Sequence, residues 1–211
     1  MSELLLSAGR RFARIATRAV VARPLLWGLF RGPLRRQFDS LARSWESRMG
    51  EEGLMPLEAA LDRLAVEPRK ALDLGTGTGK AARAVAKRFP DVQVVGVDLA
   101  PEMIREATHV LPKELEGRVT FVVADGSSLP FPDGAFDLVV LQNAIPFFDE
   151  LRRVTAPGGR AVFAFSYGAQ TPIWVPPETL RARLGEVRFG EFQEVTAGNG
   201  IALLAVRDDP G

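Results

Sequence analysis

The 211-residue sequence contains no cysteine and only one histidine. The absence of cysteine rules out a disulfide framework, a thiolate nucleophile, a cysteine-based zinc site and an iron–sulfur cluster, and we predict no metal site. No uncharged run approaches the roughly 18 residues that a membrane span needs. The N-terminus also lacks the compact apolar core and cleavage site of a signal peptide. These absences together favour a cytoplasmic protein.

Acidic residues are scarce in the first 48 positions, where ten arginines stand against Glu3, Asp39 and Glu46. Because the formal net charge of the whole chain is +1, the remaining residues sum to about −6. That acidic remainder lacks the basic face that nucleic acid demands, so no nucleic-acid partner is expected. A chain of this length can bury one sizeable core. We therefore predict one domain, residues 54–211, preceded by an Arg-rich helical extension, residues 1–53.

Short apolar runs alternate with helical patterns from Leu54 to about Ser166. This alternation predicts an α/β fold, in which a parallel sheet is covered by helices on both faces. The tail adds two strand candidates, VRFGEFQEV and IALLAVRD, joined through AGNG. The Asn-Gly pair between them indicates a hairpin. The expected architecture is a Rossmann-like, seven-stranded, mostly parallel sheet with an antiparallel C-terminal strand.

Residues 71–80 read ALDLGTGTGK, with glycines at alternate positions between an apolar run and a helix-forming run. A Walker phosphate loop is excluded, because Lys80 is followed by Ala81 instead of Ser or Thr. The dinucleotide fingerprint requires a small residue at position 80, so Lys80 disfavours a nicotinamide or flavin cofactor without excluding it. The pattern that fits is D-x-G-x-G-x-G. Such glycines let the backbone turn tightly and approach a ligand at a helix N-terminus.

Three acids, Asp73, Asp98 and Asp125, are expected at the carboxyl ends of the first three strands. Ligands of open α/β sheets bind in the crevice outside those ends. Asp98 can accept hydrogen bonds from both hydroxyl groups of a ribose, and Asp125 can accept a hydrogen bond from an adenine amino group. Other roles remain open: Asp98 can cap the helix that starts at Pro101, and Asp125 can form an Asx turn. A nucleoside that carries a carboxylate would occupy the whole crevice.

Four ordered segments carry a family resemblance: LDLGTGTG, VVGVDLAPEM, VADGSSLPFPDGAFDLVV and LRRVTAPGGRAVF. Residues 70–166 resemble the class I S-adenosylmethionine-dependent methyltransferases of the small-molecule, type 11 kind. The resemblance implies that S-adenosylmethionine is the cofactor, with Asp73 and the glycine loop at its methionine end, Asp98 at the ribose and Asp125 at the adenine edge. The implied cofactor-binding residues are Asp73, Gly75, Thr76, Gly77, Gly79, Asp98, Leu99, Met103, Ala124, Asp125, Gly126, Gln142 and Asn143.

The resemblance identifies no catalytic residue, because the sulfonium already makes the methyl group electrophilic. Asn143 and Tyr167 stand only where a substrate hydroxyl can be positioned. The run QNAIPFF lacks the Asn/Asp-Pro-Pro-aromatic motif of the similar amino-methylating enzymes, and the absence of cysteine excludes C5-cytosine methylation. We therefore expect transfer to oxygen or carbon of a small, apolar or aromatic acceptor. The run FDSLARSWES, residues 38–47, resembles the entry helix of quinone-ring methyltransferases.

The segment between Asn143 and Pro157 is shorter than is usual in the family by about one helical turn. This segment normally helps to wall the acceptor pocket. The pocket is therefore either more open in this protein or closed by the N-terminal extension.

Residues 1–36 predict a basic amphipathic helix. The apolar positions Leu5, Ala8, Phe12, Ile15 and Ala19 recur at intervals of three and four, and Arg11, Arg14 and Arg18 share a different face. One interpretation is peripheral contact with an anionic membrane. The other, which alanine in the apolar stripe favours, is a helix that packs on its own body or on a second subunit. The oligomeric state is not determined by the sequence.

Two other functions stay open at this stage. A module that binds the cofactor without turnover, and works through its basic N-terminal extension, would carry the same motifs. A dinucleotide-dependent oxidoreductase is the second alternative, and Lys80 is the residue against it.

Overall fold

The computed structural model describes residues 3–48 and 50–208, and its strands form one seven-stranded sheet in the order β3-β2-β1-β4-β5-β7-β6. The strands are β1 (Lys70–Leu74), β2 (Gln93–Asp98), β3 (Val119–Val123), β4 (Phe136–Gln142), β5 (Thr155–Phe165), β6 (Phe189–Ala197) and β7 (Gly200–Arg207). Strand β7 runs antiparallel to both of its neighbours, and the other pairs that the chain forms are parallel. The predicted fold class is confirmed.

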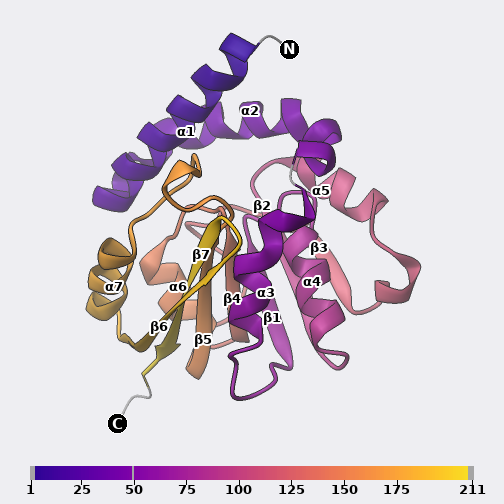
Figure 1. Ribbon diagram of the computed structural model, residues 1–211, viewed down its shortest axis with the longest axis vertical. Coiled ribbons are helices and arrows are strands. Elements are labelled where there is room, and N and C mark those ends of the chain that lie inside the picture. Colours follow the sequence, from indigo (N-terminus) through magenta and orange to yellow (C-terminus); the bar gives the residue numbers. More distant parts are fainter. Residues whose placement is uncertain (1–2, 49, 209–211) are drawn as a thin grey trace.

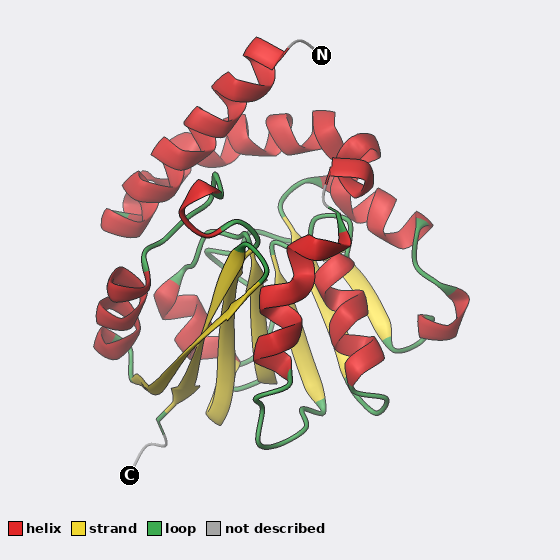
Figure 2. Ribbon diagram, in the orientation of Figure 1, coloured by secondary structure: helices red, strands yellow, loops and turns green. Residues whose placement is uncertain are grey.

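Helices cover both faces of the sheet (Figure 2). They are α1 (Glu3–Ala22), α2 (Trp27–Arg48), α3 (Met55–Leu61), α4 (Lys80–Arg88), α5 (Pro101–His109), α6 (Phe148–Val154) and α7 (Pro177–Glu186). Successive residues of β4 point to opposite faces, as strand geometry requires. Val139 and Leu141 pack with α6 and α7, whereas Leu138 and Val140 pack with α3 and α4.

The hairpin between β6 and β7 forms where the sequence predicts it, with a different pair of turn residues. Ala197 pairs with Gly200, so the two-residue loop is Gly198–Asn199. Gly198 has a φ of +54°. A left-handed glycine at the first central position is typical of a type II′ turn, whereas an Asn-Gly loop forms type I′. The hairpin therefore depends on Gly198, and Gly200 already belongs to β7.

Helices α1 and α2 form a layer above the carboxyl ends of the parallel strands (Figure 1). Their inner sides join one apolar cluster that contains Ala16 of α1, Trp27 and Leu34 of α2, and Ile145 and Ile173 of the body. The helical extension is thus confirmed, and it packs on its own body. Among the residues described, no helix combines the length and apolarity that crossing a membrane requires.

The inner face of α1 differs from the predicted apolar stripe. Ile15 is 60% exposed and Ala8 is exposed, whereas Ala13 and Ala16 are buried. Small side chains let a helix approach the body closely, so packing selects this face over the one with the larger apolar residues. The side chain of Leu5, which belongs to the same predicted stripe, lies outside the described residues.

Candidate functional site

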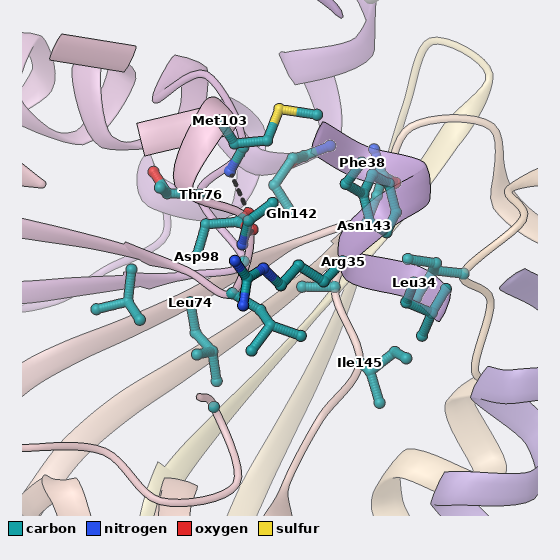
Figure 3. A pocket seen from close by; sticks show the side chains of 18 of the residues that line it. Leu34, Arg35, Phe38, Leu74, Thr76, Asp98, Met103, Gln142, Asn143 and Ile145 are labelled. Atoms are coloured by element: carbon teal, nitrogen blue, oxygen red, sulfur yellow. Dashed lines mark hydrogen bonds between the residues drawn. The ribbon is translucent and has the colours of Figure 1, made fainter. Parts of the chain in front are cut away.

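A pocket lies at the carboxyl ends of β1, β2 and β4, between the sheet and α2 (Figure 3). Ten of the thirteen predicted cofactor residues line it: Gly75, Thr76, Gly77, Asp98, Leu99, Met103, Ala124, Gly126, Gln142 and Asn143. These residues come from four separate strand ends, and the parallel sheet brings them together. Asp73, Gly79 and Asp125 are not among the residues that line the pocket. Ligand binding by each of these residues stays a prediction.

The glycine loop after β1 is left-handed at three positions, Gly75, Gly77 and Gly79, whose φ angles are +74°, +54° and +82°. The loop is tied to β2 because the N–H groups of Gly75 and Thr76 both donate to Val97 O, at 2.8 and 2.9 Å.

The three glycines meet different surroundings. A Cβ on Gly75 would lie 2.6 Å from the Cβ of Ala144, at the pocket wall. A Cβ on Gly79 would lie 2.5 Å from Cζ of Phe121, on β3. Gly79 therefore serves the packing of α4 against the sheet, and its predicted contact with the ligand stays a prediction.

Asp73 lies fully buried beneath the glycine loop. Its Oδ2 accepts hydrogen bonds from the hydroxyl of Thr76 at 2.6 Å and from the N–H of Ala82 at 2.9 Å. Burial raises the pKa of Asp73 from 3.8 to about 6, and those two hydrogen bonds oppose the shift. Asp73 thus fastens the loop to the first turn of α4, and its predicted role in ligand binding stays a prediction.

Replacing Asp73 with Asn should change how stability depends on pH. The folded protein binds the Asp73 proton more strongly than the unfolded chain, so wild type loses stability as pH rises through the window from 3.8 to about 6. The loss amounts to up to about 3 kcal/mol. Asp73→Asn lacks this titrating group and should not show the loss. The difference in unfolding free energy, variant minus wild type, should therefore increase by that amount as pH rises through the window. Urea unfolding of the ligand-free proteins at several pH values measures this difference. Asp91→Asn, at an exposed acid, should give a curve parallel to wild type, and a parallel curve for Asp73→Asn would contradict the assignment.

Asp98 joins the glycine loop to the start of α5. Its Oδ1 accepts the N–H of Ala100 at 2.8 Å, and its Oδ2 accepts the N–H of Gly77 at 2.9 Å. Burial raises the pKa of Asp98 to about 6, against these hydrogen bonds, and the charge of Asp39 raises it further. The capping role that the sequence left open is therefore present, and the half-buried carboxylate still lines the pocket.

Asp125 is held by the N-terminal extension. Its Oδ1 accepts hydrogen bonds from Nε1 of Trp27 at 2.7 Å and from the N–H of Ser127 at 2.9 Å, and its Oδ2 lies 3.5 Å from a guanidinium nitrogen of Arg31. The bond to Ser127 is the Asx turn that the sequence left open. Because Trp27 precedes Asp125 by 98 positions, no local pattern identifies this pair.

Helix α2 supplies a wall of the pocket that the predicted site omits. Its pocket-lining residues are Trp27, Leu34, Arg35, Phe38 and Trp45. The indole Nε1 of Trp45 would be 3.2 Å from a Cβ on Gly77. Near the end of the helix, Glu46 forms ion pairs with Arg83 at 3.1 Å and with Lys80 at 3.8 Å. The extension therefore forms one wall of the pocket. The feature of the sequence that could have indicated this wall is the run FDSLARSWES, residues 38–47, which resembles an entry helix.

At the end of β4, the side chains of Gln142 and Asn143 meet at Ser166. The Nε2 of Gln142 donates to Gly53 O at 3.0 Å and to the Ser166 hydroxyl at 2.8 Å, and the Nδ2 of Asn143 donates to the same hydroxyl at 2.8 Å. The Oε1 of Gln142 is buried and has no hydrogen-bond partner among the described residues. A buried acceptor without a partner is costly, so this atom suits a donor from a ligand. Tyr167 is 41% exposed and does not line the pocket.

Comparisons with known proteins agree with this geometry. The family described as a methyltransferase domain matches residues 71–159. A malonyl-[acyl-carrier protein] O-methyltransferase of Halorhodospira halophila is 36% identical over 151 residues, which are 65% of this chain and 49% of that protein. A demethylmenaquinone methyltransferase of Thermus thermophilus is 45% identical over 109 residues, 47% of this chain and 49% of that protein. The chain thus spans about half the length of these curated relatives.

A solved structure shows the same fold. It is a phosphoethanolamine N-methyltransferase of Haemonchus contortus in complex with S-adenosyl-L-methionine, with a TM-score of 0.64 at 19% identity, over 82% of this chain and 57% of that one. The sheet order, the glycine loop and the matched segment lead to one conclusion. Residues 71–159 match the methyltransferase domain family, and the chain shares the fold of the solved methyltransferase structure.

Proposed function

We propose that this protein binds S-adenosylmethionine in the pocket under α2 and transfers its methyl group to oxygen or carbon of a small, apolar or aromatic acceptor. One observation carries the proposal: a left-handed glycine loop, the carboxylate of Asp98 and the unpaired Oε1 of Gln142 line the same pocket as apolar side chains of α2. Polar groups at one part of a mostly apolar pocket are typical of a site that orients a small ligand.

The residues present fit this cofactor. The Oε1 of Gln142 needs a donor, which the ammonium group of the methionine part supplies. The carboxylate of Asp98 keeps lone pairs for two ribose hydroxyls. Apolar side chains for the adenine ring come from Leu99 and Met103, and Gly126 lines the same pocket. Asp125 accepts a hydrogen bond from Trp27, so contact with the adenine amino group requires Asp125 to share or exchange that partner.

The chain's own contribution to the reaction is alignment and exclusion of water. The bound cofactor supplies a methyl group that its sulfonium already activates. Leu34 and Phe38 of α2, with Ile145 after β4, form an apolar cover that keeps water from the reacting atoms. Orientation of two reactants in such a site is worth about 7 to 11 kcal/mol of barrier. No described residue needs to act as a base for this role.

The apolar cover also supports the class of acceptor. Trp27, Leu34, Ile145 and Ile173 belong to one buried cluster beside the pocket. An apolar or aromatic acceptor would gain from burial against these side chains. Relatives named for malonyl-[acyl-carrier protein] and demethylmenaquinone agree with a methyl acceptor other than nucleic acid.

The division into an extension, residues 1–53, and a domain, residues 54–211, stays a prediction.

Titration calorimetry tests the cofactor first. We expect S-adenosylhomocysteine to bind and NADH and NADPH to give no heat, because Lys80 occupies the position that a dinucleotide site reserves for a small residue. Transfer of a labelled methyl group into organic-solvent extracts of cells then tests the activity. Binding without transfer would favour a non-catalytic cofactor-binding module. Binding of NADH alone would reject the proposal in favour of an oxidoreductase.

A further inference from the structure

The sides of α1 and α2 that face away from the body carry exposed apolar residues. Ile15 is 60% exposed, Leu29 is 71% exposed, and Leu25, in the short helix η1 (Pro24–Leu26) that joins α1 to α2, is 97% exposed. Of the seven large apolar residues that are exposed in the described part of the chain, three therefore lie within these fifteen positions. Exposed apolar residues concentrated in one part of a surface are typical of an interaction site.

Arginines accompany these apolar residues. With 3.6 residues per turn, Arg11 and Arg18 share the side of α1 that carries Ile15, opposite the buried Ala13, Ala16 and Val20. Arg36 and Arg43 share the side of α2 that carries Leu29, opposite the buried Trp27 and Leu34. We define the outer face as Ile15, Leu25 and Leu29 with these four arginines: Arg11, Arg18, Arg36 and Arg43.

The outer face carries charge of one sign. All four of its arginines are exposed, and none has an ion-pair or hydrogen-bond partner among the side chains that the structure describes. The two acids between positions 7 and 46 are turned toward the body. Asp39 accepts the N–H of Glu102 at 3.0 Å, and Glu46 pairs with Arg83 at 3.1 Å. Asp39 and Glu46 therefore do not compensate the positive charge of the outer face. Arg43 also borders a groove that Glu102 and Glu106 of α5 line.

We propose that the outer face docks on an anionic lipid bilayer. Leu25 and Leu29 enter the boundary between headgroups and acyl chains, and the arginines contact lipid phosphates while their stems cover apolar surface. A second copy of the chain fits less well, because a two-fold contact places the same cations against each other. Nucleic acid would satisfy the arginines but leave Ile15, Leu25 and Leu29 in water. The proposal goes beyond the methyltransferase function and does not depend on it.

Vesicle flotation of the full chain tests the docking. We expect the protein to float with vesicles of phosphatidylglycerol and phosphatidylcholine, and to remain in solution with vesicles of phosphatidylcholine alone. Leu25→Ser/Leu29→Ser should lower the partition coefficient on the anionic vesicles by about tenfold or more. Arg11→Gln/Arg18→Gln should lower it by about tenfold, and added salt should weaken binding of wild type.

Matched controls come from the opposite end of the molecule. Val66→Ser replaces an apolar residue that is 62% exposed, and Arg63→Gln/Arg69→Gln removes two exposed arginines before β1. These variants should float as wild type does, and the outer-face variants should keep their melting temperature and their affinity for S-adenosylhomocysteine. Equal binding to both kinds of vesicle, equal loss in the controls, or no flotation of wild type would overturn the proposal. A dimer in sedimentation velocity that Leu25→Ser/Leu29→Ser dissociates, without flotation of wild type, would assign the face to a second copy.

Discussion

The variant Gly75→Ala should lose binding of S-adenosylhomocysteine by about 100-fold or more, and it should unfold more easily than wild type. Alanine at a φ of +74° is strained by about 1 to 2 kcal/mol. Its Cβ would also lie 2.6 Å from the Cβ of Ala144, so the loop or the segment after Asn143 has to move. Such overpacking costs a further 1 to 3 kcal/mol, roughly. The movement occurs in the pocket wall, where displacement of about 1 Å is enough to lose ligand contacts.

Gly117→Ala separates these two effects. Gly117 has a φ of +79°, close to that of Gly75, but a Cβ there would meet nothing within 4 Å. This variant should therefore lose about 1 to 2 kcal/mol of stability and keep the affinity of wild type. Urea unfolding measures the stability and titration calorimetry the affinity. If Gly75→Ala binds the ligand as Gly117→Ala does, the glycine loop does not contact the cofactor.

Replacing Asp98 with Asn should weaken binding of S-adenosylhomocysteine by about 100-fold, equivalent to about 2.7 kcal/mol. The substitution removes the charge that strengthens hydrogen bonds from ligand hydroxyls. It also places an amide NH2 group against one of two backbone donors, the N–H of Gly77 at 2.9 Å or that of Ala100 at 2.8 Å. Two donors cannot share a hydrogen bond, so the loop that Asp98 holds is loosened as well.

The matched control is Asp91→Asn, which changes an exposed acid just before the same strand. It should bind the ligand as wild type does in titration calorimetry. The folded state of Asp98→Asn is verified by circular dichroism before binding is compared. An affinity within a factor of about two of wild type would place the ribose elsewhere in the pocket.

Local patterns in the sequence were enough to predict the sheet and ten residues that line the pocket. The strand ends that carry Gly75, Asp98 and Gln142 follow from apolar runs of strand length, and a parallel sheet brings such ends to one edge without further information. The hairpin was predicted in the same way. Its turn was assigned to the wrong pair because Gly198 and Gly200 both flank Asn199, and only the pairing register separates them.

The tertiary structure decided what the N-terminal extension and the buried acids do. Asp125 binds Trp27 of the extension, and Asp73 binds Thr76 and Ala82 beneath the loop. A motif gives the position of such an acid along the chain, but the donors around it are set by how helices pack.

Helix packing also decides the position of Ile15. This side chain is exposed to solvent because the small residues of α1 pack more closely on the body. The sequence by itself determined where the strands and the glycine loop lie along the chain, since these features depend on residues that are neighbours in sequence. The pocket wall that α2 forms and the outer face depend on contacts between residues far apart in sequence. Packing free energy selects those contacts only in the folded protein.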